Sequence, residues 1–386
     1  MAENNFHGVT KNTPPNSLNS GVEVVIKKPR SSNLELYRNI CMLMIVAHHY
    51  VVNSGLFSEG GPLVTDYTSG NSVFLIFFGA WGKTGINCFV LITGYFMCKS
   101  QITFRKLLKL MLQIWFYRIL LYPIFMVAGY ETFSVTRIFK VVMPFWGLSD
   151  NFTGCFLFFY LTIPFWNVLV QHLTKRQHEL LLALLLLGYS LMGSIPSYNL
   201  SFNYVSWFGV LFLIASYIRI YPNCIFDERK LWGWLTLGSL ACALVSMLVL
   251  SRFWHSGWMG YFLVIDCNKV LAVVVAVSSF LWFKNVNIKY SKWINSFGAG
   301  TFGVLLIHAN SEAMRTWLWK DSLNVVSKYN LPLWELILYS VAVVFGVFFI
   351  CNLIDQLRIA TVEKWFFKLY DKKVLAKADT WVEQKL

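Results

Sequence analysis

An arginine and two histidines lie within one otherwise apolar segment near the start of the chain, LYRNICMLMIVAHHYVV. An imidazole is the side chain best suited to take a proton from a hydroxyl group near neutral pH. In a helix, the eleven residue steps from Arg38 to His49 return the chain to within about 20° of the same face, roughly 16 Å further along the axis. His48 is rotated from that face by about 80°. One face of this helix is therefore predicted to carry an anion-binding group at one end and a general base, His49, near its middle.

A second set of ionisable residues lies in and after the segment TFGVLLIHAN. His308, Glu312 and Arg315 are spaced i, i+4 and i+7, so a continuous helix would place them on one face. A carboxylate one turn from an imidazole can orient it and raise its basicity. The same spacing permits a salt bridge between Glu312 and Arg315, and the sequence does not choose between the two. The candidate catalytic residues are His49, His308 and Glu312.

Basic residues gather in the segment KSQITFRKLLKLMLQIW, which contains Arg105, Lys106 and Lys109. Arg118 follows in the same apolar run, and Lys83 lies in the preceding one. Arginine and lysine side chains bind phosphate groups, so this cluster suits a phosphate-rich ligand on the cytoplasmic side. Membrane proteins also place Lys and Arg in cytoplasmic loops for reasons of topology, which accounts for most of these residues taken singly.

The elements that must carry these residues are transmembrane helices. Of the 386 residues, 56% are hydrophobic and 13% are charged, and the mean hydropathy is +0.54; roughly a quarter of the residues are charged in an ordinary soluble domain. A helix needs about 20 mostly apolar residues to cross about 30 Å of hydrocarbon. We predict an all-α polytopic membrane bundle of about ten transmembrane helices, near residues 34–57, 73–97, 107–128, 152–170, 179–195, 202–220, 231–250, 261–283, 297–318 and 332–356.

The distribution of Lys and Arg predicts the orientation of this bundle. With both termini in the cytoplasm, the cytoplasmic tails and loops hold most of the 33 basic residues. We expect a multi-pass protein of the inner (cytoplasmic) membrane, with a disordered tail at 1–32, a transmembrane domain at 33–360 and a basic tail at 361–386. The net charge of +14 is then drawn to the lipid bilayer's anionic headgroups and requires no nucleic acid. The eight cysteines are scattered singly, which indicates neither a disulfide framework nor a metal site.

Three patches of the sequence resemble the membrane acyltransferase 3 family, whose multi-span members are O-acyltransferases of surface glycans. Arg38 and His49 match the family's signature of arginine, ten residues and histidine. GKTGINCFVLITGYFM is similar to the family's stretch of glycine, aromatic residues and Ser-Gly-Phe/Tyr. TFGVLLIHAN, with His308, is similar to the late YLIH element. The resemblance extends over about residues 33–360.

Two positions depart from the family pattern. Thr93 stands where the family usually has serine before Gly94, which keeps a hydroxyl group and the glycine. Leu305 stands where members often have tyrosine, so no role for that hydroxyl carries over. We expect no attached hydrolase-like soluble domain of the kind found in some members. We therefore expect the membrane domain to handle the acceptor itself or to pass it on to polysaccharide-assembly proteins.

The resemblance implies transfer of an acyl group from acyl-CoA, most often acetyl-CoA, on the cytoplasmic side to a sugar hydroxyl at or beyond the membrane. It implies that His49 is the catalytic histidine, as a base or a transient acyl carrier, and that Arg38 engages the donor's phosphates. His308 and Glu312 would line the site, orient the acceptor or complete a proton path. The candidate donor-binding residues are Arg38, Arg105, Lys106, Lys109 and Arg118.

Two other classes of function use the same residues. A proton-coupled transporter or glycan flippase would use the buried His, Glu and Arg side chains as a proton or substrate path, although the sequence shows no internal repeat of the kind common in transporters. A structural scaffold for envelope assembly would leave those charges as salt bridges only. Lys83 and Arg118 are candidates for balancing charge near the thioester, and Lys269 is expected to pair with Asp266 at i, i+3.

Overall fold

The chain folds into helices, and no strand occurs among the residues that the structure describes. The computed structural model describes residues 31–145, 148, 151–198 and 203–373, so most of the tail predicted at 1–32 lies outside the described residues. π-Helical turns at Leu186–Leu191, Thr316–Ser322 and Ile359–Glu363 extend α8, α13 and α14. The helices are α1 (Ser32–Val52), α2 (Pro62–Thr65), α3 (Gly70–Gly79), α4 (Gly82–Met97), α5 (Phe104–Val127), α6 (Val135–Val142), α7 (Phe152–His172), α8 (Lys175–Leu185), α9 (Tyr204–Ile220), α10 (Arg229–Phe253), α11 (Val270–Lys284), α12 (Lys292–His308), α13 (Glu312–Arg315), α14 (Leu333–Arg358) and α15 (Lys364–Lys373).

The all-α prediction is confirmed over the described residues, and each of the ten predicted apolar runs contains a helix, although the run at 261–283 is helical mainly from Val270 and the run at 297–318 is interrupted after His308. Within the described residues, five helical segments are long and apolar enough to cross a membrane: Gly70–Met97, Phe104–Val127, Phe152–His172, Arg229–Phe253 and Leu333–Leu369. Two further apolar helices, α9 and α11, are shorter than the length usually needed. The structure thus identifies five candidate spans, and the count of ten stays a prediction.

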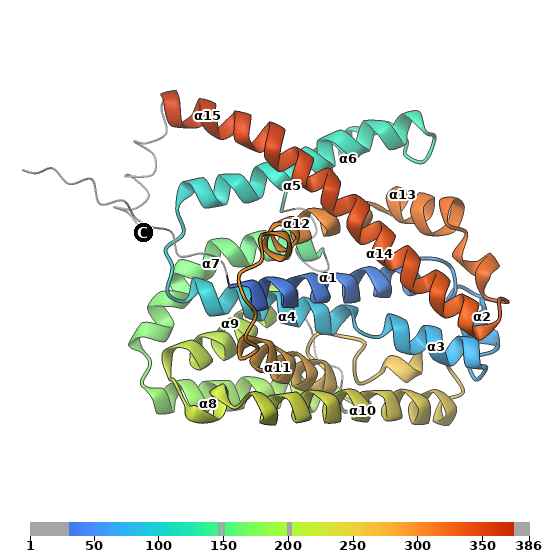
Figure 1. The fold of residues 1–386 in the computed structure, drawn as a ribbon, viewed down its shortest axis with the longest axis horizontal. Coiled ribbons are helices and arrows are strands. Elements are labelled where there is room, and N and C mark those ends of the chain that lie inside the picture. The colour runs from blue at the N-terminus through green and yellow to red at the C-terminus, as the bar shows by residue number, and fades with distance from the viewer. Residues whose placement is uncertain (1–30, 146–147, 149–150, 199–202, 374–386) are drawn as a thin grey trace, which may run out of the picture.

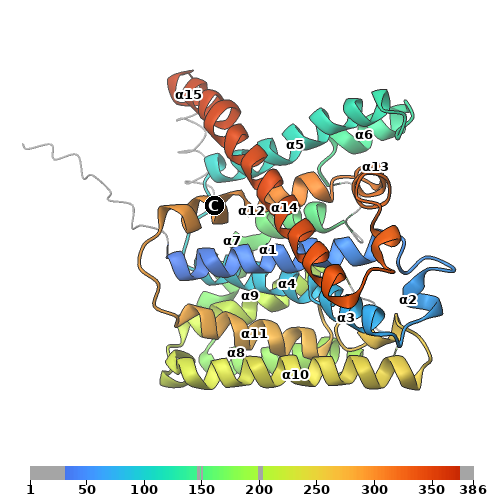
Figure 2. The same ribbon diagram turned by 45° about the vertical axis from the view of Figure 1, so that its right-hand side comes forward.

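Helix α1 runs through the middle of the bundle (Figures 1 and 2). It packs against α3, α4, α11, α12 and α14, and its side chains Tyr37, Val46 and Tyr50 are buried. Helices α10 and α11 pair along one side of the molecule, while α14 crosses the other side. Because protein surrounds α1, its ionisable side chains face other helices, as intramembrane charges require.

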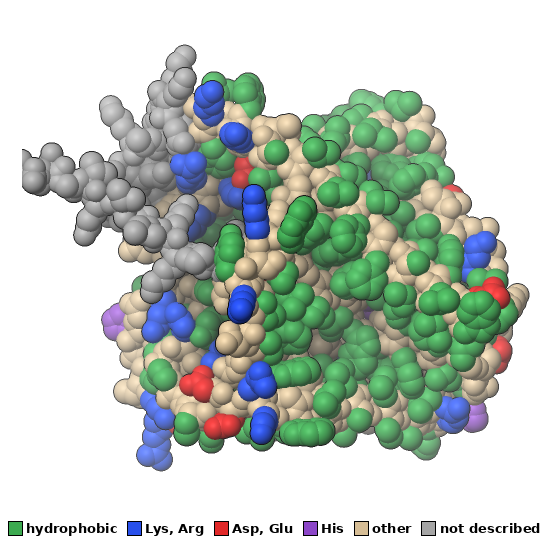
Figure 3. Space-filling model, viewed as in Figure 1, with side chains coloured by type: hydrophobic (Ala, Val, Ile, Leu, Met, Phe, Trp, Pro, Cys, Tyr) green, Lys and Arg blue, Asp and Glu red, His purple; other side chains and the backbone are tan. Residues whose placement is uncertain are grey.

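The outer helices present apolar side chains to their surroundings. Ile119 on α5, Phe165 on α7 and Val249 on α10 are all exposed. Figure 3 shows hydrophobic side chains over the middle of one face, with Lys and Arg gathered toward the end of the bundle where α15 lies. We call this the α15 end. A broad apolar surface with a basic margin suits a bilayer, whose core accepts apolar side chains and whose headgroups attract cations.

The apolar run predicted at 73–97 is two helices, because α3 ends at Gly79 and α4 begins at Gly82. A Cβ at Gly79 would lie 2.6 Å from Cβ of Val51, and one at Gly82 would lie 2.3 Å from Cγ of His48. Both glycines therefore let α1 approach the break closely. Non-helical backbone at membrane depth is tolerated where it is buried in protein or lines a cavity, and this break adjoins a cavity.

A buried carboxylate joins three helices near the α15 end. Asp355 on α14 is fully buried and accepts hydrogen bonds from Tyr117 Oη (2.8 Å), from Gln113 Nε2 (3.2 Å to each oxygen) and from Arg358 Nε (2.7 Å). On α12, a Cβ added at Gly303 would lie 2.1 Å from Cγ of Asp355. The carboxylate therefore lies directly against the α12 backbone while it is bonded to α5, which fixes the position of α12.

Candidate active site

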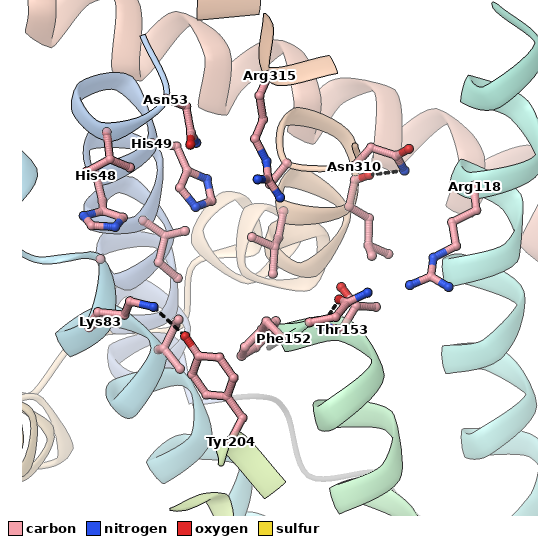
Figure 4. Close-up of a pocket in the computed structure, with 18 residues that line it drawn as sticks. His48, His49, Asn53, Lys83, Arg118, Phe152, Thr153, Tyr204, Asn310 and Arg315 are labelled. Carbon is pink, nitrogen blue, oxygen red and sulfur yellow. Dashed lines mark hydrogen bonds between the residues drawn. The ribbon is translucent and has the colours of Figure 1, made fainter. Parts of the chain in front are cut away.

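A cavity of about 480 Å³ lies where several helices begin or end around the C-terminal part of α1 (Figure 4). It is bounded by the last turns of α1 and α12, the first turns of α4, α7 and α9, the middle of α5, and α13. Its volume falls in the range of sites for small molecules. The polar side chains that line it are those of His48, His49, Asn53, Lys83, Arg118, Asn151, Thr153, Tyr204, Asn310 and Arg315.

The imidazole of His49 is hydrogen-bonded to the imidazole of His308. Nδ1 of His49 lies 2.9 Å from Nε2 of His308, and Nδ1 of His308 lies 2.6 Å from the Val304 carbonyl oxygen. A carbonyl only accepts, so Nδ1 of His308 carries its hydrogen. With both rings neutral, Nε2 of His308 accepts the hydrogen bond that Nδ1 of His49 donates. Nε2 of His49 is then the nitrogen with the lone pair, on a side chain that lines the cavity.

This tautomer gives His49 the nitrogen that a base or nucleophile needs. No group among the described residues donates a hydrogen bond to Nε2 of His49, so its lone pair can meet a ligand. His308 is fully buried and reaches the cavity only through His49. A fixed tautomer and ring orientation are what the third member of a catalytic triad supplies to its histidine. Here the chain is carbonyl, His308 and His49, so His308 is a positioning residue.

His48 has a different environment, as its rotation from the His49 face predicts. Its Nδ1 lies 2.6 Å from the carbonyl oxygen of Gly79, the last residue of α3, and donates to it. The break between α3 and α4 leaves such carbonyls without a helical partner. His48 therefore supports the backbone at the break, although its ring also lines the cavity.

Lys83 enters the cavity from the first turn of α4. Its ammonium group donates a hydrogen bond to Tyr204 Oη at 2.5 Å (Figure 4). One turn further along, the buried Asn87 accepts a hydrogen bond from Trp207 Nε1 at 2.9 Å. Two side-chain hydrogen bonds thus join α4 to α9, and the first of them fixes the Lys83 side chain beside the cavity. The sequence identifies Lys83 as a candidate but gives no sign of Tyr204.

Two arginines face the cavity from other helices (Figure 4). Nη1 of Arg118 on α5 donates to the Met143 carbonyl oxygen at 3.2 Å. Arg315 on α13 lies 3.5 Å from a carboxylate oxygen of Glu312, and its buried Nε has no hydrogen-bond partner among the described residues. Together with Lys83 these side chains give the cavity three cations. No Asp or Glu side chain lines it within the described part of the chain.

Arg38 does not line this cavity. It occupies the first half of α1, about 16 Å along the axis from His49, as the sequence predicts. Its guanidinium group lies 3.4 Å from both carboxylate oxygens of Glu35 and 5.6 Å from the centre of the Phe89 ring. Arg38 and His49 thus belong to one helix but to two separate environments, one toward the α15 end and one at the cavity.

The remaining candidate donor-binding residues lie near the start of α5, at the α15 end. Arg105 covers the ring of Phe367 at 4.9 Å. Lys106 donates to the Gln101 carbonyl oxygen at 2.7 Å, and Lys109 forms an ion pair with Glu363 at 2.5 Å. These three residues are not brought to His49. Of the candidates for donor binding, the structure places only Arg118 in the cavity.

The expected single face of His308, Glu312 and Arg315 is wrong. Helix α12 ends at His308, and a new short helix begins at Glu312 with Ser311 as its N-cap, accepting from the Met314 N–H. The Glu312 side chain is 74% exposed and pairs with Arg315. The salt-bridge alternative is therefore the one observed, and Glu312 does not contact His308.

The expected pair of Lys269 and Asp266 is also not formed. The Lys269 ammonium group donates to the Gly193 carbonyl oxygen at 2.5 Å and lies 4.4 Å from the centre of the Phe262 ring. Both residues precede α11, which begins at Val270, so helical i, i+3 spacing does not apply to their side chains. Lys269 links two connecting segments and plays no part in the cavity.

Several cavity residues carry no signal in the sequence. Asn53 and Asn310 follow the last turns of α1 and α12, Asn151 and Thr153 begin α7, and Tyr204 begins α9. Asn and Thr are common at helix ends everywhere, so their types alone do not mark a site. Over the described residues, no group of three or more His, Cys, Asp or Glu side chains is placed to hold a metal ion.

The fold and the cavity define a helical membrane protein with a base-bearing polar site buried among its helices. The chain belongs to the acyltransferase 3 family: that family, described as an acyltransferase domain, matches residues 31–352. The matched range contains every residue that lines the cavity. The resemblance seen in the sequence is confirmed, and the protein is an acyltransferase with membrane helices. Comparison with curated proteins and with solved structures gave no match.

Proposed function

We propose that this acyltransferase is an O-acetyltransferase of the cytoplasmic membrane, with both termini in the cytoplasm. It moves an acetyl group from cytoplasmic acetyl-CoA to a hydroxyl group of a surface polysaccharide or of its lipid-linked precursor. The observation that carries this proposal is the free Nε2 of His49 at the cavity, with Nδ1 held by His308. Family membership supplies the acyl-transfer chemistry that such a base would serve.

In the proposed reaction, the acceptor's hydroxyl oxygen attacks the carbonyl carbon of the thioester while Nε2 of His49 takes the hydroxyl proton. A C–O bond forms, and the carbonyl oxygen becomes an oxyanion. The cationic side chain of Lys83 lines the same cavity and would stabilise that charge. The intermediate then breaks its C–S bond, and the imidazolium returns the proton to the departing CoA thiolate. In the alternative route, Nε2 of His49 itself attacks the thioester with the same lone pair and forms an acetyl-histidine. Reaction with labelled acetyl-CoA would then leave the label bound to the protein.

The separation of Arg38 from His49 suits a reaction that spans the membrane. Arg38, Arg105 and Lys106 lie toward the α15 end, where positive residues gather and where a phosphate-rich donor would bind from the cytoplasm. The cavity lies toward the other ends of α1 and α12. A donor held at its phosphates near Arg38 would extend its uncharged thioester arm toward His49, and the acceptor would enter from the opposite side.

The test is acetyl transfer by the purified protein in nanodiscs, with acetyl-CoA as donor and lipid-linked glycans extracted from the host membrane as acceptor. We expect His49→Ala to lower kcat by about 10²- to 10⁴-fold, the usual contribution of a general base. We expect Arg38→Gln to weaken acetyl-CoA binding. His172→Ala is the matched control, because His172 is an exposed histidine at the end of α7, outside the cavity. A kcat in His49→Ala that equals that of the wild type would overturn the proposal.

A further inference from the structure

We propose that the acceptor is anionic, with a carboxylate or phosphate beside the hydroxyl group that is acetylated, and that Arg118 and Arg315 bind this anion. This inference rests on the proposed function and specifies its substrate class. It begins from the charge of the cavity, which Lys83, Arg118 and Arg315 line without any Asp or Glu among the described lining residues.

Within the described residues, Arg118 has no acidic partner and Arg315 has one, which lies outside the cavity. The hydrogen-bond partner of Arg118 is a neutral carbonyl, that of Met143, and no carboxylate lies within 4.0 Å of it in the described part of the chain. Arg315 has an acidic neighbour in Glu312, but at 3.5 Å, with the carboxylate 74% exposed and outside the cavity. Its Nε is buried with no partner among the described residues.

Arg118 is partly buried and the Arg315 side chain is 38% exposed, and cations at membrane depth are costly unless an opposite charge or hydrogen bonds compensate them. The reaction develops one negative charge, on one oxygen, and Lys83 is already fixed beside His49's cavity by Tyr204. Two further guanidinium groups exceed what that oxyanion requires. The planar guanidinium group matches carboxylate and phosphate oxygens in a bidentate manner, which lysine does not. An anion on the ligand accounts for both arginines.

The geometry assigns this anion to the acceptor and not to the donor. In acetyl-CoA the charges are on the phosphates, and the thioester end is neutral. The cavity contains His49, so the neutral end of the donor must reach it, while Arg38 and Arg105 lie toward the α15 end. Figure 4 shows Arg118 on the side of the cavity away from Lys83 and Arg315 beside His49, with Asn310 and Thr153 between the two arginines. These polar side chains would bind sugar hydroxyls.

The test compares a charged sugar with its neutral counterpart. Binding of methyl β-D-glucuronide, methyl β-D-glucoside and glucose 1-phosphate to the protein in nanodiscs is measured by calorimetry, for wild type, Arg118→Gln and Arg315→Gln. We expect at least one anionic sugar to bind tenfold or more tightly than the glucoside, and each Arg→Gln change to remove most of that preference. Arg252→Gln is the matched control, because Arg252 is an exposed arginine at the end of α10 outside the cavity.

Equal binding of charged and neutral sugars, or no binding of any anionic sugar, would overturn the inference. So would a loss of affinity in the Arg→Gln proteins that is the same for the glucoside. A failure of the proposed function gives a different result. The wild-type protein would then not consume acetyl-CoA in the presence of extracted glycans, regardless of which sugars it binds. Anion binding that competes with acetyl-CoA would assign the two arginines to the donor and would also refute the inference.

Discussion

The hydrogen bond between two imidazoles decides which nitrogen of His49 can react. Val304 and His308 together commit Nδ1 of His49 to donating, so Nε2 keeps its lone pair at the cavity. His48, the adjacent residue, donates to Gly79 and belongs to the backbone of the α3–α4 break. The two neighbouring histidines thus have different roles because their hydrogen-bond partners differ.

Removing His308 should therefore impair the reaction without weakening donor binding. In His308→Ala, the ring of His49 loses its only hydrogen-bond partner among the described residues and can rotate or change tautomer. We expect kcat to fall by about 10²-fold, at the lower end of the range for general-base catalysis, with the KM for acetyl-CoA unchanged. Steady-state release of CoA thiol measures both constants.

The control for this variant is His172→Ala, since His172 is exposed at the end of α7 and bonds only to the Val168 carbonyl within its own helix. It should retain wild-type constants. An increase in KM with unchanged kcat in His308→Ala would show that His308 shapes the donor site and does not orient the base.

At the residue scale, the sequence predicts that His49 is the candidate base and that it lies about 16 Å from Arg38 along one helix face, because the rotation and rise per residue are constant within a helix. It could not predict that His308 contacts His49, since helical periodicity says nothing about contacts between helices. The wrong placement of Glu312 had a readable warning in Ser311, whose type favours an N-cap and so a new helix. Tyr204 and Arg315 enter the cavity through the packing of α9 and the turn after α12.

Close approach of helices positions these residues. Gly94 on α4 lets α9 approach closely, since a Cβ there would lie 3.0 Å from Cβ of Ala215. Thr93 donates to the Phe89 carbonyl in its own helix, so its hydroxyl is not turned to the cavity. The glycine that the family pattern keeps at position 94 therefore lies at a close helix contact. The break after Gly79 was missed because the apolar pattern continues across it.

Gly303 offers a test of how α12 is held. An added Cβ would lie 2.1 Å from Cγ of Asp355, a buried carboxylate with three hydrogen-bonding partners that restrict its movement. We expect Gly303→Ala to lower the free energy of unfolding by about 1–3 kcal/mol, as overpacking does. His308 is five residues further on the same helix, so kcat should fall as well. Thermal unfolding and CoA release measure the two effects.

The matched control is Gly346→Ala on α14, where an added Cβ meets nothing within 4 Å. The same substitution in an open helical position should be neutral or stabilise by up to about 1 kcal/mol. If Gly303→Ala and Gly346→Ala were equally stable, the Asp355 contact would not be what fixes α12.

The two ends of the bundle differ in charge, and this difference bears on how the molecule is oriented in the membrane. The described chain begins at α1 and finishes at α15 at the same end of the bundle, and Figure 3 shows Lys and Arg gathered there. Both features agree with the sequence-based prediction, which needed only the positive-inside rule. The prediction that the α15 end faces the cytoplasm can be tested in cells.

Cysteine labelling at two positions can test which end of the bundle faces the cytoplasm. Cys224 is exposed in the connection between α9 and α10, at the α15 end, whereas Ser327 is exposed in the connection before α14, at the opposite end. In a Cys242→Ala background, which removes the other exposed thiol, we expect a membrane-impermeant maleimide to label Ser327→Cys in intact cells. Cys224 should be labelled only after the membrane is permeabilised. The remaining cysteines are buried and should stay unlabelled in the folded protein.

The reverse pattern would place Arg38 and the basic residues of α5 outside the cell, where acetyl-CoA does not reach them, and the cavity toward the cytoplasm. The donor would then have to enter at Arg118 and Arg315, and those arginines would bind its phosphates. The labelling experiment thus bears on the reaction as well as on the topology, because the cavity's cations can serve an anionic acceptor only if the cavity opens away from the donor.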